Sequence, residues 1–393
     1  MKKVLILGAG IYQVPLIKKS KQLGYYTIVS SIPGNYPGFL YADKVYYVNT
    51  VDREAILKLA REEKIDAILT TGTDVAVSTI GYVCDKQGLC GISEETAHGV
   101  TNKACMKKLL KKGGVRTADF HVVKSLDEAY DVYDRMETPV IFKSVDLSGS
   151  RGIMKVDSRE QIPTAFKYAM SKTHCDYILI EEFLDGYEIG VDGYIGNGNC
   201  FIVPHDKLVY FNGATNVPIG HIFPYFCSDE LRADICEQIE KALYALHLER
   251  VFFNADVMIC GEKSYLIEIG ARCGATCIPE LISTHYGIDY YELMIRNAMG
   301  ERLYFPSKPV CVSMGRLLLS EKSGCITDVR INTPLDKVDQ LVLDFGVGDH
   351  VDKFVVGADR IGHLAVHASD FETAKQLLED ASASIQIIVD ESR

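Results

Sequence analysis

The sequence predicts a protein of mixed α/β and α+β class with three parts. These are a Rossmann-like N-terminal domain over residues 1–98, an α+β core over 99–305 and a β-rich C-terminal α+β domain over 306–393. Up to residue 98, short apolar runs alternate with helical segments of about 10 to 15 residues, as in a parallel sheet with crossover helices. Beyond it, strand-like segments predominate. Pro306 and Pro309 bracket a predicted linker, and 393 residues suit two to three domains.

The N-terminal part begins with a glycine turn that is half of a dinucleotide-binding fingerprint. Gly8 and Gly10 follow the first strand, but Gln13 stands where the third glycine belongs. Ser30 stands where the second strand needs an acidic residue for a ribose. The pattern therefore favours a plain tight turn, and an NAD-dependent oxidoreductase is the weaker alternative. The predicted strands here are 4–7, 27–29, 45–48 and 66–70, and the helices are 12–23 and 53–63.

The remaining two parts carry a different mixture of elements. In the core we predict helices at 103–112, 126–136, 161–170 and 229–246, strands at 120–123, 140–143, 153–156, 253–260 and 264–269, and strand-rich sequence over 177–210. In the last part we predict strands at 310–319, 325–331, 353–356, 361–367 and 385–389, and a helix at 371–381.

Composition excludes several classes of function. With 42 basic and 53 acidic residues the net charge is −11, which disfavours sequence-independent nucleic-acid binding. No apolar run approaches about 18 residues, so we expect no membrane span, and residues 1–8 are too short and too soon broken by glycine for us to expect a signal peptide. The twelve cysteines include no C-x-x-C pair, which predicts reduced thiols in a cytoplasmic protein. Cys273 and Cys277 come closest to a metal–thiolate pair but have no histidine partners.

A lysine and a glycine–serine loop form the first chemical motif. Lys143 ends a strand, and residues 148–152 read Ser-Gly-Ser-Arg-Gly. Glycines allow close backbone approach, successive N–H groups can form an anion nest, and the lysine supplies a positive charge for phosphate. A surface hairpin remains the alternative.

The second motif runs from residue 178 to residue 188. An apolar strand leads into Glu181 and Glu182, then Phe183 and Leu184, and Glu188 follows a turn. Backbone groups near Phe183 and Leu184 suit the edge of a purine, and Glu188 suits ribose hydroxyls. A solvated acidic loop is the alternative.

The third motif is a hairpin with two opposed carboxylates. A three-residue loop at 261–263 would place Asp256 directly opposite Glu268, about 5 Å away. Like charges so placed need a cation between them, and Mg²⁺ binds through one or two carboxylates plus substrate phosphates. Arg272 then suits a clamp on a carboxylate or phosphoryl group, with a salt bridge as the alternative. Alternation predicts one apolar face, made of Val257, Ile259, Tyr265, Ile267 and Ile269.

In this order the motifs resemble the ATP-grasp superfamily over nearly the whole chain, in the branch of carboxylate–amine ligases and biotin-carboxylase-like enzymes. The resemblance implies a two-subdomain ATP-grasp core with a lid over about residues 117–179. It departs from the usual Glu-x-Asn-x-Arg pattern at Gly270, which replaces an asparagine metal ligand. The implied catalytic residues are Arg272 and Lys143, and the implied metal ligands are Asp256 and Glu268, for one or two Mg²⁺ or Mn²⁺ ions. The implied ATP-binding residues are Lys103, Lys143, Ser148, Gly149, Ser150, Gly152, Glu181, Glu182, Phe183, Leu184 and Glu188.

The resemblance also implies an activity. An ATP-dependent ligase would activate a small carboxylate as an acyl phosphate and couple it to an amine, releasing ADP and phosphate. Its partners would be small molecules, with neither nucleic acid nor membrane, and the protein would be a homodimer. A carboxylase using bicarbonate is the runner-up, and a non-catalytic nucleotide sensor is a third possibility. For His205, Asp206, Lys207 and His221, which lie where an acceptor could bind, structural roles are favoured.

Overall fold

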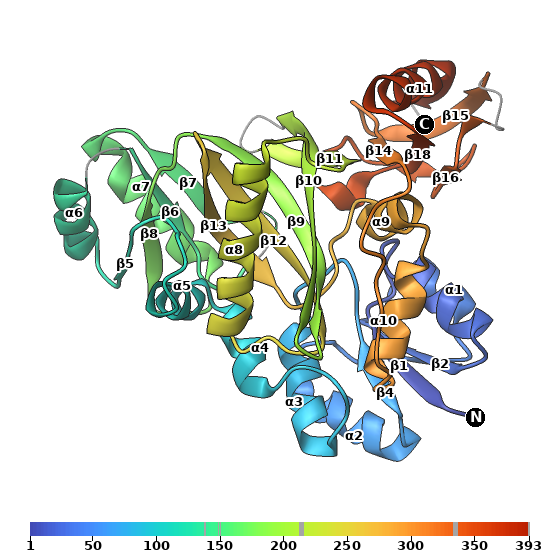
Figure 1. The fold of residues 1–393 in the computed structure, drawn as a ribbon, viewed down its shortest axis with the longest axis horizontal. Coiled ribbons are helices and arrows are strands. Elements are labelled where there is room, and N and C mark those ends of the chain that lie inside the picture. Colours follow the sequence, from blue (N-terminus) through green and yellow to red (C-terminus); the bar gives the residue numbers. More distant parts are fainter. Residues whose placement is uncertain (137–138, 148, 150, 212–215, 333–336, 392–393) are drawn as a thin grey trace.

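The structure, a computed structural model, describes residues 1–136, 139–147, 149, 151–211, 216–332 and 337–391. Its helices and strands fall into three regions in Figure 1. The N-terminal part lies at the lower right, a small sheet with two helices lies at the left, and a large central sheet runs on into the C-terminal strands at the upper right. This arrangement confirms the predicted fold class.

The N-terminal part is a parallel sheet in the order β3-β2-β1-β4, as predicted. The N-terminus of α2 is capped by Asp52, whose side chain accepts from the Ala55 N–H, and α2 has its predicted bounds. The strands are β1 (Lys3–Leu7), β2 (Tyr26–Ser30), β3 (Lys44–Tyr46) and β4 (Ala67–Leu69). The helices are α1 (Val14–Gln22), α2 (Arg53–Glu63), α3 (Val77–Gln87) and α4 (Glu94–Thr101), with a short 3-10 helix η1 (Pro37–Tyr41).

The segment predicted to be a lid, named the lid segment, forms a four-stranded antiparallel sheet in the order β5-β8-β6-β7. Phe142 and Ile180 are fully buried in its own core, beneath two helices. Because β8 lies between β5 and β6, it brings Glu181 beside the strand that ends in Lys143. The strands are β5 (Phe120–Val123), β6 (Val140–Lys143), β7 (Ile153–Val156) and β8 (Ile178–Glu182). The helices are α5 (Lys103–Lys112), which precedes the sheet, α6 (Leu126–Arg135) and α7 (Ile162–Lys172), with η2 (Arg159–Gln161) before α7.

The central sheet has eight antiparallel strands in the order β13-β12-β9-β10-β11-β14-β18-β16. Helix α8 (Asp229–Ala245) lies over one face, and Ile235 and Ile239 are buried there against β9 and β12. Because β11 pairs with β14, the sheet continues across the predicted linker. The predicted domain boundaries stay predictions. The strands are β9 (Tyr187–Gly196), β10 (Asn199–Phe211), β11 (Asn216–Phe223), β12 (Val251–Cys260), β13 (Lys263–Gly270), β14 (Val312–Leu318), β16 (Gln340–Leu343) and β18 (Gly362–Ala368).

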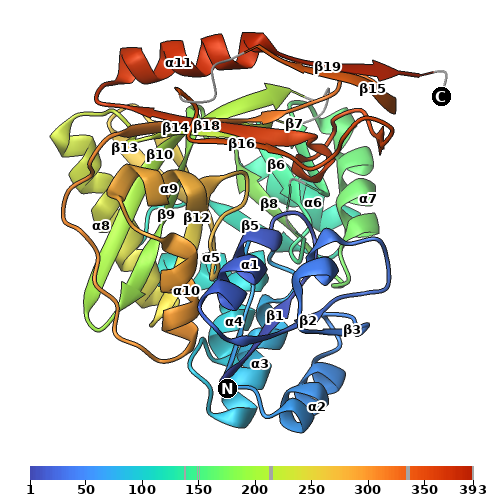
Figure 2. The same ribbon diagram turned by 90° about the vertical axis from the view of Figure 1, so that its right-hand side faces the viewer.

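Two helices, α9 (Ile278–Tyr286) and α10 (Tyr290–Ala298), connect the central sheet to the N-terminal sheet, as Figure 2 shows from the side. One apolar core contains Ile6 and Leu16 of the N-terminal part, Tyr290 of α10 and Phe223 of the central sheet. The N-terminal part and the central sheet therefore share one core through α9 and α10, whereas the small sheet has a core of its own.

The C-terminal region adds a second sheet, β17-β15-β19, and the helix α11. The predicted strand at 353–356 is wrong. The N–H groups of Val355 and Val356 both donate to the Asp359 carboxylate, so these donors close a turn and form no strand ladder. The elements are β15 (Gly324–Ile331), β17 (His350–Val351), β19 (Ile385–Asp390), α11 (Phe371–Ser384) and η4 (Gly357–Asp359). Within the described ranges, no helix combines the length and apolar character needed to cross a bilayer.

Candidate active site

A buried cluster of two lysines and one glutamate lies between α5 and the lid sheet. Lys143 Nζ lies 2.8 Å from Glu181 Oε2, and Lys107 Nζ lies 3.3 Å from the same oxygen. Lys107 and Glu181 are each 1 % exposed. The other carboxylate oxygen, Oε1 of Glu181, is buried and has no hydrogen-bond partner among the described residues. Glu181 Oε1 is therefore an unused acceptor, and it lies in a cluster with two lysines and one carboxylate.

The pKa shifts follow from that imbalance. Burial on its own raises the pKa of Glu181, but Lys143 and Lys107 together outweigh it and lower the pKa. Burial lowers the pKa of Lys107 to about 8; the charge of Lys143 also lowers it, and Glu181 only partly offsets these effects. Two lysines against one glutamate give this cluster an excess positive charge that suits an anionic ligand such as a polyphosphate.

Lys103 links the start of α5 to the predicted phosphate loop. Asn102 caps α5 by accepting from the Cys105 N–H, and the Lys103 N–H donates to Val145 O at 2.8 Å. The side-chain Nζ of Lys103 lies 2.5 Å from Leu147 O and 3.1 Å from Glu268 Oε2. Lys103 therefore joins the helix, the loop and the carboxylate hairpin.

The loop that follows Lys143 closes on itself. The Ser144 N–H donates to Gly152 O at 3.0 Å, and Gly152 has φ +73°. A Cβ there would lie 2.5 Å from Ser144 Oγ, so the turn requires glycine. Gly149 also has positive φ, whereas Ser148 and Ser150 lie outside the described residues.

The segment predicted for the purine base follows directly after Glu181. Glu182 is exposed, and Lys155 Nζ lies 4.3 Å from the centre of the Phe183 ring. The Phe183 N–H already donates to Pro139 O at 3.2 Å. A backbone N–H donor to an adenine edge would therefore have to come from Leu184 and not from Phe183.

The carboxylate hairpin brings Asp256 and Glu268 directly opposite each other, as predicted. The predicted loop length is wrong, because Cys260 pairs with Lys263 and the loop has two residues. A register shift after Asp256 compensates. Because of this shift the predicted apolar face is partly wrong. Leu266 is buried in the core, whereas Tyr265 and Ile267 are only half-buried. The buried set on these two strands includes Val257, Ile259, Leu266 and Ile269.

Lysines balance the two opposed carboxylates. Lys207 Nζ pairs with Asp256 and, at 2.6 Å, with Glu188, while Lys103 pairs with Glu268. Desolvation raises the pKa of Asp256 to about 6, with Glu188 and Glu268 adding to it against Lys207. For Glu268, burial acts to raise the pKa, but Lys103 outweighs it and the pKa is lowered.

The donor set of the hairpin fits a hard divalent cation. In the described part of the chain, no group of three or more His, Cys, Asp or Glu side chains could hold a metal by itself. Two opposed carboxylates are what Mg²⁺ uses when substrate phosphates complete its coordination. The residues therefore fit a metal that arrives with a nucleotide.

Arg272 lies beyond the hairpin at the junction with the N-terminal part. Its guanidinium donates to Asn254 Oδ1 at 2.8 Å and to Asp74 Oδ2 at 2.7 Å. Arg272 therefore forms a salt bridge, which was the alternative to a clamp on substrate. Gly270 lies opposite Asn254, and a Cβ there would be 2.8 Å from Asp74 Oδ1. The glycine at 270 thus leaves room for the aspartate that holds Arg272.

The histidines of the strand-loop region are buried. His205 is fully buried and lies 3.0 Å from Asp192 Oδ2 through Nε2, while its ring stacks on Phe223. Burial, reinforced by His205, lowers the pKa of His221 well below its usual value. Asp206 accepts from the Lys207 N–H. Of the four residues of this region, Lys207 is the one whose side chain reaches the carboxylate pair.

The side chain of Gln13 fills the N-terminal glycine turn. Gln13 Oε1 accepts from the Gly10 N–H at 2.9 Å, and Gln13 Nε2 donates to Thr71 O at 2.6 Å. Gln13 is 5 % exposed. The turn N–H that a dinucleotide pyrophosphate would need is therefore satisfied internally, which supports the tight-turn reading.

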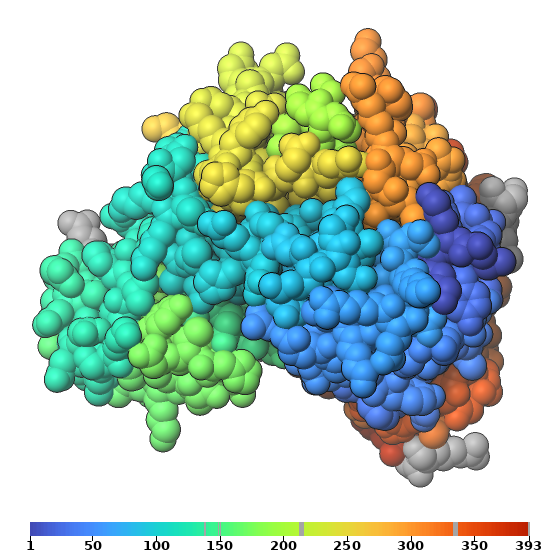
Figure 3. Space-filling view, turned by 90° about the horizontal axis from the view of Figure 1, so that it is seen from below, coloured from blue at the N-terminus to red at the C-terminus, as the bar shows by residue number. Residues whose placement is uncertain are grey.

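Sequence reasoning missed Lys107 and Asp74 and gave Lys207 a structural role. Lys107 stands four residues after Lys103, so the two share one helix face, and that spacing could have identified it. Asp74 follows β4 at the edge facing Arg272. No local pattern marks Lys207. Figure 3 shows the surface hollowed between the lid segment, in teal and green, and the N-terminal part, in blue.

Two family models match the chain. Residues 101–276 match the phosphoribosylglycinamide synthetase ATP-grasp (A) domain, and residues 316–390 match the L-amino acid ligase C-terminal domain 2.

Whole-chain comparisons agree with both models. A phosphoribosylglycinamide synthetase from Anaerococcus prevotii superposes with a TM-score of 0.85 at 30% identity, covering 99% of this chain and 100% of that one. An L-amino acid ligase from Bacillus licheniformis superposes with a TM-score of 0.82 at 19% identity, covering 100% and 99%. A formate-dependent phosphoribosylglycinamide formyltransferase of Rhodococcus jostii is 25% identical over 313 residues, which is 76% of this chain and 75% of that protein.

Proposed function

The chain belongs to the ATP-grasp superfamily, in the branch of carboxylate–amine ligases and biotin-carboxylase-like enzymes, and we propose that it couples a small carboxylate of the amino-acid class to an amine. It is an ATP-dependent, ADP-forming ligase, and ATP-grasp enzymes generally use ATP with Mg²⁺ or Mn²⁺. The observation that carries the proposal is the opposed pair Asp256 and Glu268, with Glu268 paired to Lys103, which lies one helical turn before Lys107 of the lysine–glutamate cluster.

We assign the nucleotide to the space between the lid segment and the hairpin. Glu181 Oε1, unpartnered within the described chain, is a ready acceptor for the adenine amino group. Lys143 and Lys107 supply positive charge for phosphate, and Lys103 joins the loop to the hairpin. Glu188, held by Lys207, remains the assigned ribose ligand.

Asp256 and Glu268 would hold the metal ion. When bound, the ion neutralises charge on the phosphate chain. Lys207 and Lys103 balance the two carboxylates in this structure, so they keep the hairpin electrically matched when nucleotide is absent.

The reaction follows from these positions. A carboxylate oxygen of the first substrate attacks the γ-phosphorus in line, the bond to the bridging oxygen breaks, and ADP leaves. The amine nitrogen then attacks the acyl carbon, phosphate departs, and the proton lost from nitrogen passes to solvent. Arg272, fixed by Asp74 and Asn254, orients the carboxylate through its positive charge.

The family-model match supports substrates of the amino-acid class, because residues 316–390 match an L-amino acid ligase domain. A bicarbonate-using carboxylase remains the second candidate, carried by the biotin-carboxylase-like branch.

We also propose a cytoplasmic homodimer. All twelve cysteines are free thiols, as expected for a reducing compartment. Light scattering of the purified chain measures the oligomeric state directly.

A coupled phosphate-release screen tests the activity. Pairs of amino acids, and bicarbonate with each amine, are supplied with ATP and Mg²⁺. We expect phosphate release to require both an amino-acid carboxylate and an amine. Lys143→Ala and Glu268→Ala should abolish turnover and leave the chain folded, whereas Lys111→Ala, an exposed lysine of α5, should not change it. Release with bicarbonate alone would favour the carboxylase, and wild-type rates in either site variant would contradict the assigned roles.

A further inference from the structure

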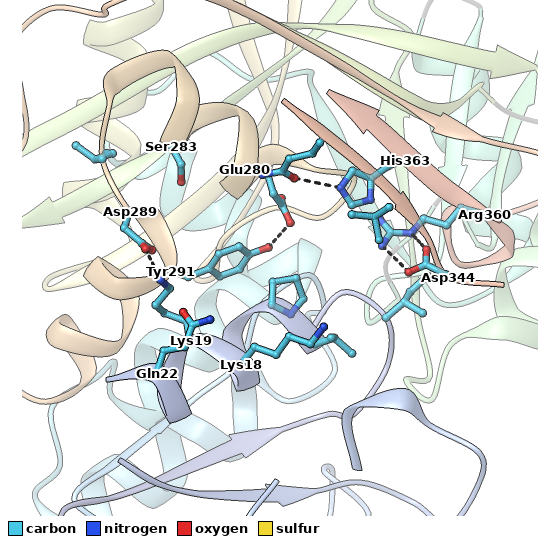
Figure 4. A pocket seen from close by; sticks show the side chains of 16 residues that line it. Lys18, Lys19, Gln22, Glu280, Ser283, Asp289, Tyr291, Asp344, Arg360 and His363 are labelled. Atoms are coloured by element: carbon cyan, nitrogen blue, oxygen red, sulfur yellow. Dashed lines mark hydrogen bonds and ion pairs between the residues drawn. The ribbon is translucent and has the colours of Figure 1, made fainter. Parts of the chain in front are cut away.

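A second cavity of about 400 Å³ lies where α1, the start of α9 and strands β16 and β18 meet. Figure 4 shows its lining side chains, which come from the N-terminal, central and C-terminal regions. None of the lysines, carboxylates or arginine assigned to ATP and substrate lines it. Part of the wall is apolar and consists of Ile11, Val14, Pro15, Ile288 and Val342.

Two buried acceptors in this wall lack donors. Glu280, in the first turn of α9, accepts from the Tyr291 hydroxyl at 2.8 Å through Oε1, and its Oε2 is buried with no partner within the described residues. His363 is 3 % exposed, and its Nδ1 is likewise buried without a partner among the residues described. Buried polar atoms in native proteins are normally satisfied, so this pair indicates a donor supplied from outside the chain.

The protonation states define that donor. Burial lowers the pKa of His363 to about 3, so its imidazole is neutral. Nε2 lies 3.3 Å from Gln340 Oε1; with the proton on Nε2, Nδ1 is an acceptor. Burial raises the pKa of Glu280, and a neighbouring cation would favour its charged form. A protonated amine suits both groups.

The remaining charges of the wall are matched except for one. Lys19 pairs with Asp289 at 2.6 Å, and Arg360 pairs with Asp344. Lys18 is exposed on α1 with its Nζ 4.2 Å from the centre of the Tyr41 ring, and within the described ranges it has no carboxylate partner. Glu280 and Lys18 are therefore the acidic and the basic side chain of this wall that lack an ion-pair partner among the described residues.

We propose that this cavity is a second small-molecule site that binds an α-amino acid with an apolar side chain. Glu280 and His363 accept from its ammonium group, Lys18 holds its carboxylate, and the apolar wall contacts its side chain. A wall with opposite unmatched charges selects a zwitterion over a simple amine or a simple acid.

A smaller space lies between the cavity and the loop that follows Arg272. A small space of about 10 Å³, also bounded by Glu280 and Arg360, adjoins the loop that follows Arg272. Tyr12 narrows this space, with its hydroxyl donating to Gly357 O at 2.6 Å. The occupant is either the amine substrate held before reaction or a separate effector, and the two have the same chemistry.

Calorimetric titration of the full chain, saturated with a non-hydrolysable ATP analogue, tests the site. The probes are L-leucine, L-leucinamide, which lacks the carboxylate, and N-acetyl-L-leucine, which lacks the ammonium group. We expect L-leucine to bind, and the other two to bind at least about tenfold more weakly. Lys18→Met and Glu280→Gln should each weaken L-leucine at least about tenfold, and Lys21→Met, on α1 but paired with Asp43 and outside the cavity, should not.

Several outcomes would overturn the proposal. They are no saturable binding of L-leucine up to about 10 mM, equal binding of the three probes, or unchanged binding in both cavity variants. Lys18→Met is a surface change that should not disturb folding, so it remains informative if Glu280→Gln is unstable. The Asp256→Asn variant should keep L-leucine binding while losing ligation, so failure of the proposed function and failure of this site give different results.

A turnover assay separates the two sources of the occupant. If it is the amine substrate, Lys18→Met raises KM for that substrate and leaves kcat near wild type. If it is an effector, L-leucine changes the rate without being consumed, and Lys18→Met removes that change.

Discussion

Substitutions of Glu181 and Lys107 test whether one buried carboxylate compensates two buried lysines in the cluster. In the nucleotide-free protein, one buried carboxylate stands against two buried ammonium groups. Glu181→Gln leaves both lysines uncompensated, and removing one partner of a buried ion pair costs about 3–5 kcal/mol. Lys107→Met instead leaves Lys143 paired with Glu181 and removes an ammonium whose pKa burial has lowered to about 8. We expect its cost to be below about 1 kcal/mol.

Native-state hydrogen exchange of the amides in β6 and β8 measures this difference locally. Glu181→Gln should speed their exchange by about 100- to 4,000-fold, and Lys107→Met by less than about tenfold. Lys111→Met serves as a control, because Lys111 pairs with Asp119 on the surface and such pairs contribute little. A Lys107→Met variant as unstable as Glu181→Gln would refute the reasoning, since it would mean that Lys107 stabilises rather than strains the cluster.

Two further predictions follow from the site and the core. A Cβ at residue 270 would lie 2.8 Å from Asp74 Oδ1, so Gly270→Asn should disturb the Asp74–Arg272 ion pair. Steady-state kinetics should then show KM for the carboxylate raised about tenfold and KM for ATP unchanged. An unaltered carboxylate KM would contradict the role of Arg272. Burial lowers the pKa of His285 to about 4, so between pH 6.5 and 4 the unfolded chain binds a proton that the folded chain does not, and stability falls as pH falls. Between about pH 7.5 and 5.5 this histidine should account for about 1.3 kcal/mol of that loss, and urea unfolding of His285→Gln should show a correspondingly smaller pH dependence than wild type; equal pH dependence of the two proteins would exclude a buried neutral imidazole.

Sequence periodicity predicted the elements that bury a regular apolar face. Helices over 53–63 and 103–112 and strands over 120–123, 140–143 and 153–156 have the predicted bounds. In each case the apolar spacing and a local cap or turn favour the same structure. The predicted strand at 353–356 fails because Asp359 draws the backbone donors of Val355 and Val356 into a turn.

The candidate site was predictable where its residues share one strand or hairpin. The pairing of Asp256 with Glu268 follows from hairpin logic, and a register shift compensates for the wrong loop length. Contacts between distant segments were not predictable. Lys207 reaches Asp256 from β10, and Asp74 reaches Arg272 across 198 residues of chain, so each depends on tertiary packing that no local pattern encodes.

Transfer of labelled oxygen tests the central claim most directly, namely that ATP activates a carboxylate by phosphorylation. An amino acid labelled with oxygen-18 in its carboxylate is incubated with the enzyme, ATP, Mg²⁺ and an amine, and the released phosphate is analysed by mass spectrometry. The account predicts ADP as the nucleotide product and one labelled oxygen in each phosphate released by coupling. Unlabelled phosphate, or AMP with pyrophosphate, would contradict it.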